Sequence, residues 1–246
     1  MLDMTPSRRA CVAGALLAGL SVALSSPAAA DPPAEIERLR TDWAQLLQYR
    51  DENNRLPPPR AARPRVIFLG DSITQSWDLA GLPLDKVEVL NRGISGQTTP
   101  QMLVRFRQDV VDLKPAVVHI LAGTNDLAGN TGPTTLEAIE SNLSSMAEIA
   151  EANHIRVVLA SVLPTLDYPW APGREPAPKI AALNDWMRTY AGRHGLVYAD
   201  YYFELVDSRG GCKAGLADDG VHPNHAGYAA MGPVARQSIR RALALH

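Results

Sequence analysis

The pattern of apolar and polar residues predicts that strands and helices alternate over most of the chain. Short apolar runs of the length of buried strands are separated by longer stretches in which apolar residues recur three and four positions apart. The apolar runs cover residues 66–69, 87–90, 116–121, 156–160 and 196–199. The helical patterns cover residues 99–113, 134–152, 178–194 and about 225–245. This order predicts an α/β domain with a mainly parallel five-stranded sheet over residues 65–246.

Residues 1–30 predict a signal peptide. Arg8 and Arg9 precede an apolar run, and small residues lead up to Ala30, which is the usual order of a secretory signal and its cleavage site. The run is too short for a helix that crosses a bilayer about 30 Å thick. We therefore expect an exported protein, periplasmic or secreted, that is cleaved near Ala30 and has no stable membrane anchor. An uncleaved anchor is the alternative, and both the Sec and the twin-arginine export routes stay open.

Residues 31–64 predict a cover for the domain, followed by a linker. Apolar residues at spacings of three and four predict an amphipathic helix over residues 35–54. The proline-rich stretch LPPPRAARPR then ends the helix, because proline lacks a backbone N–H and restricts its neighbours.

Charge and cysteine content exclude some partners. The formal net charge is −2, so we expect no basic surface for nucleic acid or for an anionic membrane. Of the two cysteines, Cys11 lies in the predicted signal, which leaves Cys212 alone and no internal disulfide in the exported protein. The sequence leaves the oligomeric state open.

Polar residues follow the predicted strands at the edge where parallel sheets bind ligands, the carboxyl ends of the strands. Asp71 and Ser72 follow the first strand, Arg92 and Gly93 the second, and Asn125 the third. The loop ADDGVHPNH precedes the last predicted helix. We therefore expect one site built from several loops at this edge.

Ser72 is the candidate nucleophile of that site. His222 lies in the last loop, and Asp219 stands three residues before it, a spacing that lets the carboxylate fold back and orient the imidazole as a base. A helix cap is the alternative role for Ser72. A metal site is the alternative role for the last loop, with Asp218, Asp219, His222 and His225 as ligands.

Acyl transfer also needs fixed donors for the developing negative charge. The candidates are the backbone N–H groups of Ser72 and Gly93 and the side-chain amide of Asn125. Three further residues are candidates for substrate contact because of their chemistry and loop position: Arg92, Tyr168 and Trp170.

Four sequence blocks together resemble the GDSL or SGNH hydrolase family of esterases and lipases. They are GDSI with Ser72, NRGISG with Gly93, GTND with Asn125, and DGVH with Asp219 and His222. Within the family the chain resembles the small acylhydrolases related to platelet-activating-factor acetylhydrolase and lysophospholipase L1. The resemblance implies a flavodoxin-like three-layer α/β/α sandwich. It also implies a Ser-His-Asp acyl-enzyme mechanism that needs no cofactor and no metal.

The predicted function is therefore a serine esterase. Only three phenylalanines and no long apolar lid favour short acyl groups such as acetyl, carried by a small molecule or a glycan. A lysophospholipase or longer-chain lipase is the alternative, because residues 163–178 could form an apolar groove. Two rivals from other classes are a binding module without catalysis and a phosphate binder. The latter lacks the glycine-rich phosphate signatures.

Overall fold

The protein, described here by a computed structural model for residue 37 and residues 40–244, is built around one five-stranded sheet. All neighbouring strands are parallel, in the order β2-β1-β3-β4-β5. The strands are β1 (Arg65–Gly70), β2 (Glu88–Gly93), β3 (Val117–Leu121), β4 (Arg156–Ala160) and β5 (Val197–Ala199). The predicted parallel sheet is confirmed, and it is parallel throughout.

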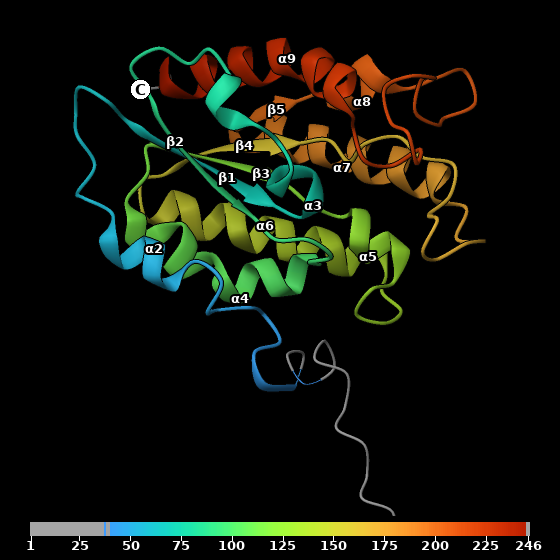
Figure 1. Ribbon diagram of the computed structural model, residues 1–246, viewed down its shortest axis with the longest axis horizontal. Coiled ribbons are helices and arrows are strands. Elements are labelled where there is room, and N and C mark those ends of the chain that lie inside the picture. The colour runs from blue at the N-terminus through green and yellow to red at the C-terminus, as the bar shows by residue number, and fades with distance from the viewer. Residues whose placement is uncertain (1–36, 38–39, 245–246) are drawn as a thin grey trace, which may run out of the picture.

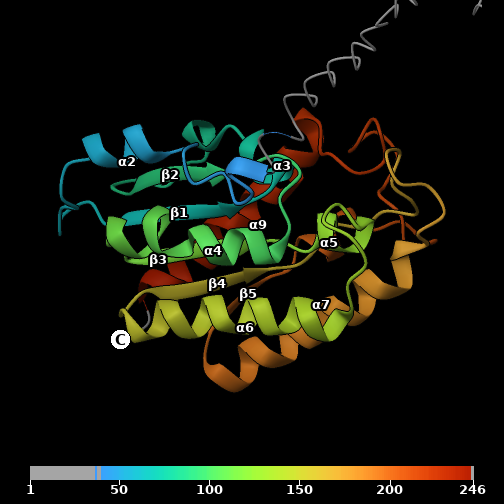
Figure 2. The same cartoon turned by 90° about the horizontal axis from the view of Figure 1, so that it is seen from below.

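Helices cover both faces of the sheet and make three layers (Figure 1). In β1, Ile67 and Leu69 enter one core cluster while Val66 and Phe68 enter the other, because successive side chains of a strand point to opposite faces. The first face is covered by α4 (Thr99–Asp109), α6 (Leu136–Ala152) and α7 (Pro176–His194). The second is covered by α8 (Tyr201–Leu205) and α9 (His225–Ala244). The view in Figure 2 shows the same layers from below, and the predicted sandwich is confirmed.

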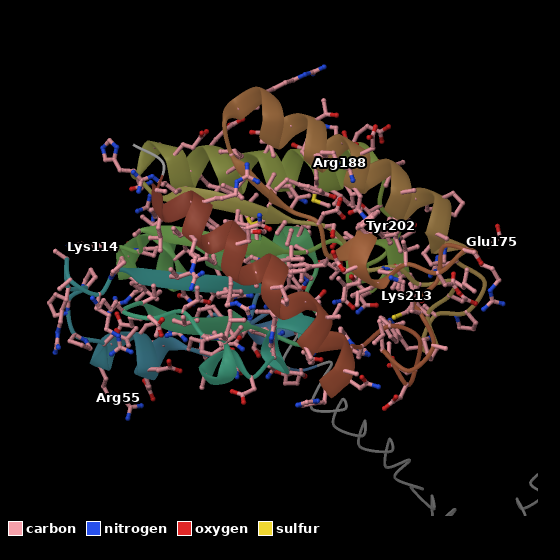
Figure 3. All side chains as sticks on the ribbon, turned by 90° about the horizontal axis from the view of Figure 1, so that it is seen from above. Arg55, Lys114, Glu175, Arg188, Tyr202 and Lys213 are labelled. Carbon is pink, nitrogen blue, oxygen red and sulfur yellow. The ribbon has the colours of Figure 1, made fainter. Side chains whose placement is uncertain are left out.

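Short helices follow the strands at the edge predicted to carry the site. They are α3 (Ser72–Gln75) after β1 and α5 (Thr124–Ala128) after β3, whereas the short helices η1 (Leu79–Gly81) and η2 (Val111–Leu113) come before β2 and β3. In Figure 3, Lys114 marks the amino end of the sheet, and Glu175 and Lys213 mark loops at the opposite end. Helices α3 and α5 begin just after β1 and β3, so their first turns lie at the carboxyl edge of the sheet.

The single helix predicted over residues 35–54 is wrong for the part that the structure describes. The chain turns between residues 42 and 49, and helix α2 spans only Arg50–Arg55. The Asp42 carboxylate accepts the backbone N–H groups of Leu46 at 2.7 Å and Leu47 at 3.0 Å, so it replaces the carbonyl acceptors of a continuous helix. The predicted signal peptide lies outside the described residues.

Residues 40–56, here called the N-terminal strap, run along the edge strand β2 and helix α4. Three glutamine side chains hold it by donating to strap carbonyls: Gln97 to Ala44 at 2.8 Å, Gln101 to Trp43 at 2.7 Å, and Gln108 to Leu46 at 2.8 Å. The strap is therefore held by side-chain donors to its backbone carbonyls more than by a helical face. No helix among residues 40–244 is long and apolar enough to cross a membrane.

Candidate active site

Ser72 is the first residue of helix α3, directly after strand β1. The cap of this helix is Asp71, whose side chain accepts the N–H of Ile73 at 2.9 Å. The alternative role of Ser72 as the cap is therefore taken by its neighbour. The Ser72 N–H belongs to the first turn of the helix, where backbone N–H groups have no acceptor within the helix.

Ser72, His222 and Asp219 form a hydrogen-bonded chain. Ser72 Oγ lies 2.9 Å from His222 Nε2, and His222 Nδ1 lies 2.6 Å from Asp219 Oδ2. These contacts join the end of β1 to the loop before α9, across 150 residues of sequence. His222 is therefore placed to take a proton from Ser72 while its second nitrogen is held by a carboxylate.

The loop around Asp219 folds back on itself, as its spacing predicts. Asp219 Oδ1 accepts the backbone N–H groups of Val221 at 2.9 Å and His222 at 2.7 Å, which leaves Oδ2 free for the imidazole. Partial burial alone would raise the pKa of Asp219, but the hydrogen bonds from His222 and Val221 outweigh it and lower this pKa. The carboxylate therefore stays ionised, which suits an orienting partner of a base.

Asn125 lies in α5, after β3, and its amide joins the same edge. Its Nδ2 donates to Asp71 Oδ2 at 3.2 Å and to the Gln97 carbonyl at 3.1 Å, and its Oδ1 accepts from Asn130 at 2.9 Å. Asn125 is 3% exposed, so these bonds fix a buried amide. The amide nitrogen faces the residue that precedes Ser72.

Gly93 was predicted to donate its N–H to the site, and this prediction is wrong. The Gly93 N–H donates to Asn91 Oδ1 at 2.9 Å. A Cβ at Gly93 would lie 2.2 Å from the backbone nitrogen of Gln75 and 2.7 Å from the carbonyl carbon of Thr74. Glycine is needed here because the end of β2 packs directly against helix α3.

Gly96 is the residue that the sequence analysis missed. It has φ of +76°, which glycine adopts readily, and within residues 40–244 its N–H has no protein acceptor. Two successive carbonyls of its loop accept hydrogen bonds from asparagines near the site. The Gly96 carbonyl accepts from Asn130 at 3.2 Å, and the Gln97 carbonyl accepts from Asn125. The second glycine of NRGISG was the signal that could have indicated it.

Arg92 is not a substrate contact, contrary to prediction. It is 1% exposed, and its guanidinium donates to Asn53 Oδ1 at 2.8 and 3.0 Å and pairs with Glu52 at 3.0 Å. The group also lies 4.6 Å from the ring centre of Tyr49. All three partners belong to the N-terminal strap, so Arg92 fastens the strap to β2.

The two predicted aromatic contacts separate into one buried and one exposed side chain. Tyr168 is fully buried in the core under its loop, so it supports the loop and the prediction of a contact surface is wrong. Trp170 is 42% exposed, and its ring centre lies 5.3 Å from that of Tyr168 and 5.6 Å from that of His222. Trp170 therefore forms an accessible aromatic surface beside the imidazole.

The structure does not gather the four residues of the alternative metal site. Asp218 accepts from Asn224 at 2.7 Å, and Asp219 is bound to His222. No group of three or more His, Cys, Asp or Glu side chains in the described part of the chain could hold a metal ion.

Asp71 carries a pH dependence of stability. Burial raises its pKa to about 7, against the opposing hydrogen bond from the N–H of Ile73. The folded pKa lies above the unfolded one, so the stability that the protonated group contributes is full below about pH 4 and is lost as the pH rises to about 7. The variant Asp71→Asn carries no charge at this position, so its stability does not have this pH dependence. We expect the free energy of unfolding of the variant minus that of the wild type to rise by about 2 to 3 kcal/mol from about pH 5 to pH 8.

Urea unfolding of both proteins across this range measures the difference. Comparing the two proteins at each pH cancels the titrations of groups that do not interact with Asp71, including that of His119, whose pKa burial lowers to about 3. A difference that stays constant from about pH 5 to pH 8 would contradict the raised pKa of Asp71.

The parallel sheet carries a hydrogen-bonded Ser–His–Asp chain at the carboxyl ends of its strands, an arrangement that is recognised by geometry and not by the order of residues. The model of the GDSL-like Lipase/Acylhydrolase family matches residues 68–230. The chain belongs to this family of carboxylic ester hydrolases.

Solved structures and curated proteins show the same relationship. A putative acylhydrolase from Bacteroides fragilis is 41% identical, with a TM-score of 0.77 over 82% of this chain and 99% of that one. A GDSL-like lipase from Bacteroides thetaiotaomicron is 39% identical, with a TM-score of 0.76 over 82% of this chain and 100% of that one. Esterase TesA of Pseudomonas aeruginosa is 28% identical over 67% of this chain and 82% of its own length. The uncharacterized lipoprotein YqeF of Bacillus subtilis is 30% identical over 42% of this chain and only 49% of its own length.

Proposed function

We propose that the protein hydrolyses carboxylic esters through an acyl-enzyme on Ser72. The observation that carries this proposal is the chain of contacts from Ser72 Oγ through His222 to Asp219, at 2.9 and 2.6 Å. His222 Nε2 takes the Ser72 proton as Oγ attacks the ester carbonyl. The same nitrogen then gives the proton to the leaving alcohol.

Water completes the reaction in a second step. His222 removes a proton from the water, which attacks the acyl carbonyl, and the carboxylic acid leaves as Ser72 regains its proton. The ionised Asp219 stabilises the imidazolium that forms in both steps.

We also propose that Ser72, Gly96 and Asn125 stabilise the oxyanion. The N–H groups of Ser72 and Gly96 have no protein acceptor in the described residues, so they are available to a substrate oxygen. The Asn125 amide nitrogen is held beside Asp71, so it exchanges one of its present acceptors for the oxyanion. Fixed donors of this kind each contribute about 3 kcal/mol to lowering the barrier.

Short acyl esters, acetyl above all, are the proposed substrates. The loop of residues 163–178 borders a hollow beside Asp219, but Leu163 is buried in the core and the lining of the hollow includes the charged side chains Asp167 and Arg209, so it is not a long apolar groove. Trp170 remains exposed beside His222, and an aromatic face of this kind can stack on a sugar ring. An acetyl group on a glycan therefore fits the site better than a long acyl chain does.

Export is part of the same proposal. The pattern of residues 1–30 supports it, although these residues lie outside the described structure. The similarity to YqeF, which is named a lipoprotein, is in keeping with a location outside the cytoplasm.

The rate of hydrolysis should fall with acyl-chain length. On p-nitrophenyl esters from acetate to palmitate, we expect kcat/KM to be highest for acetate and at least about tenfold lower for palmitate. A long acyl chain that finds no long apolar groove gains no binding energy from its added methylenes. The release of p-nitrophenol measures each rate, and Ser72→Ala serves as the blank for spontaneous hydrolysis.

A maximum at long chains would overturn the proposal of acetyl esters. It would favour the lysophospholipase alternative, and lysophosphatidylcholine would then be the next substrate to test. With a maximum at acetate, acetylated glycans are the next substrates to test.

A further inference from the structure

Three loops of the proposed active site meet at the side chain of Asn130. The loop after β2 contributes Gly96, helix α5 after β3 contributes Asn125, and the loop after β4 contributes Trp170. We infer that Asn130 is a positioning residue, which holds the amide of Asn125 in the orientation that the oxyanion requires and is itself held by Trp170. This inference rests on the proposed function.

The two ends of the Asn130 amide are distinguished by partners of fixed polarity. The Trp170 indole can only donate, and its Nε1 lies 3.1 Å from Asn130 Oδ1. The Gly96 carbonyl can only accept, and it lies 3.2 Å from Asn130 Nδ2. A flip of this amide would face donor with donor and acceptor with acceptor, so only one orientation is allowed.

The orientation of Asn130 passes to Asn125. Asn130 Nδ2 also donates to Asn125 Oδ1 at 2.9 Å, and its backbone N–H donates to the Asn125 carbonyl at 3.0 Å. Since the oxygen of the Asn125 amide is held by Asn130, the nitrogen faces the opposite side, toward Asp71. Asn130 thus fixes both the backbone and the side chain of Asn125.

The hydrogen bond from Asn130 to Asn125 Oδ1 does not have to break during the reaction. At the nitrogen end, an N–H of Asn125 must leave Asp71 or Gln97 to reach the oxyanion. The oxygen end keeps its partner Asn130 through both steps. This contact therefore keeps the amide in place while the nitrogen changes partners.

Asn130→Asp tests the inference with little change in shape. The carboxylate still accepts from Trp170, but it cannot donate to Asn125 Oδ1 or to the Gly96 carbonyl. On p-nitrophenyl acetate we expect kcat to fall about tenfold while KM stays within about twofold, because a misplaced donor is felt mainly in the transition state. The Ki of a trifluoromethyl ketone, which forms an oxyanion on Ser72, should rise by the same factor.

Trp170→Phe is the second variant, at a side chain that is 42% exposed. It keeps an aromatic ring beside His222 and removes only the N–H donor to Asn130. We expect kcat to fall about threefold, and the double variant Asn130→Ala/Trp170→Phe to be no slower than Asn130→Ala alone, since Trp170 acts through Asn130.

Asn153→Asp is the matched control. Asn153 caps helix α6, where its Nδ2 donates to the Ile149 carbonyl at 2.7 Å, and the variant should keep the kcat and the Ki of the wild type. Unchanged kcat and Ki in Asn130→Asp, or losses that multiply in the double variant, would overturn the inference. Ser72→Ala separates the two proposals. If Ser72→Ala is inactive, the proposed function stands even when the inference about Asn130 fails. If Ser72→Ala stays active, the proposed function itself fails.

Discussion

Ser72→Ala is expected to lower kcat on p-nitrophenyl acetate by at least about 10⁴-fold, because the bond that starts the reaction can no longer form. Ser72 Oγ is 2.9 Å from His222 Nε2 and makes no other side-chain hydrogen bond among the described residues, so its loss should leave the fold intact. The kinetics of the purified variant and its thermal unfolding measure the two effects separately.

The effects of removing Ser72 and His222 are expected not to add. His222→Ala alone should lower kcat to nearly the same level, and the double variant should be no slower than either single one, because both residues act in one proton transfer. Ser76→Ala is the matched control, since Ser76 is exposed at the end of the same helix α3 and should keep full activity. Multiplying losses in the double variant would show that the two side chains act independently.

Gly93→Ala is expected to lower the free energy of unfolding by about 3 kcal/mol or more. The added Cβ would lie 2.2 Å from the backbone nitrogen of Gln75, and backbone atoms cannot move aside as the end of a flexible side chain can. The strain falls on helix α3, so Ser72 is displaced and activity is lost in the fraction that folds. Urea unfolding and the specific activity of the soluble protein measure both results.

Gly192→Ala is the control for this substitution. Gly192 lies in helix α7 with open space around it, so alanine should be neutral or stabilise the helix by up to about 1 kcal/mol. A Gly93→Ala variant that is as stable as wild type would contradict the close packing of β2 against α3. A stable variant with reduced kcat would return Gly93 to a direct role in the reaction.

Sequence alone could predict the elements whose signals are local. The strands follow from short apolar runs, and both termini of β4 agree with the prediction. The contact between Asp219 and His222 follows from a spacing of three residues in one turn. Its meeting with Ser72 follows from the parallel sheet, which brings the carboxyl ends of all strands to one edge.

The side chains at the end of β2 could not be assigned from sequence. Neighbouring residues of a strand face opposite sides, so Asn91 and Arg92 cannot both face the same layer. Asn91 donates to the Thr74 carbonyl of helix α3, and Arg92 turns to the N-terminal strap instead. Which of the two faces the site depends on what packs against each layer, and that is a property of the whole fold.

Sequence also could not tell which of the two glycines in NRGISG has a backbone N–H available to the site. Gly93 and Gly96 both follow the predicted second strand, and spacing does not distinguish a backbone N–H that already donates to a side chain from one that has no acceptor. The broken N-terminal helix also depends on one side chain, because the Asp42 carboxylate competes with the backbone for two N–H groups. Periodicity of apolar residues carries no information about such competition.

Covalent labelling tests most directly whether Ser72 is the nucleophile. The wild-type protein is treated with diethyl p-nitrophenyl phosphate, which phosphorylates an activated serine, and peptide mass spectrometry locates the adduct. We expect one diethylphosphoryl group per chain, on the peptide that contains Ser72, formed in proportion to the loss of esterase activity and absent from Ser72→Ala. Complete inactivation with the label on another residue, or a Ser72→Ala variant that is labelled and inactivated like the wild type, would contradict the assignment of Ser72 as the nucleophile.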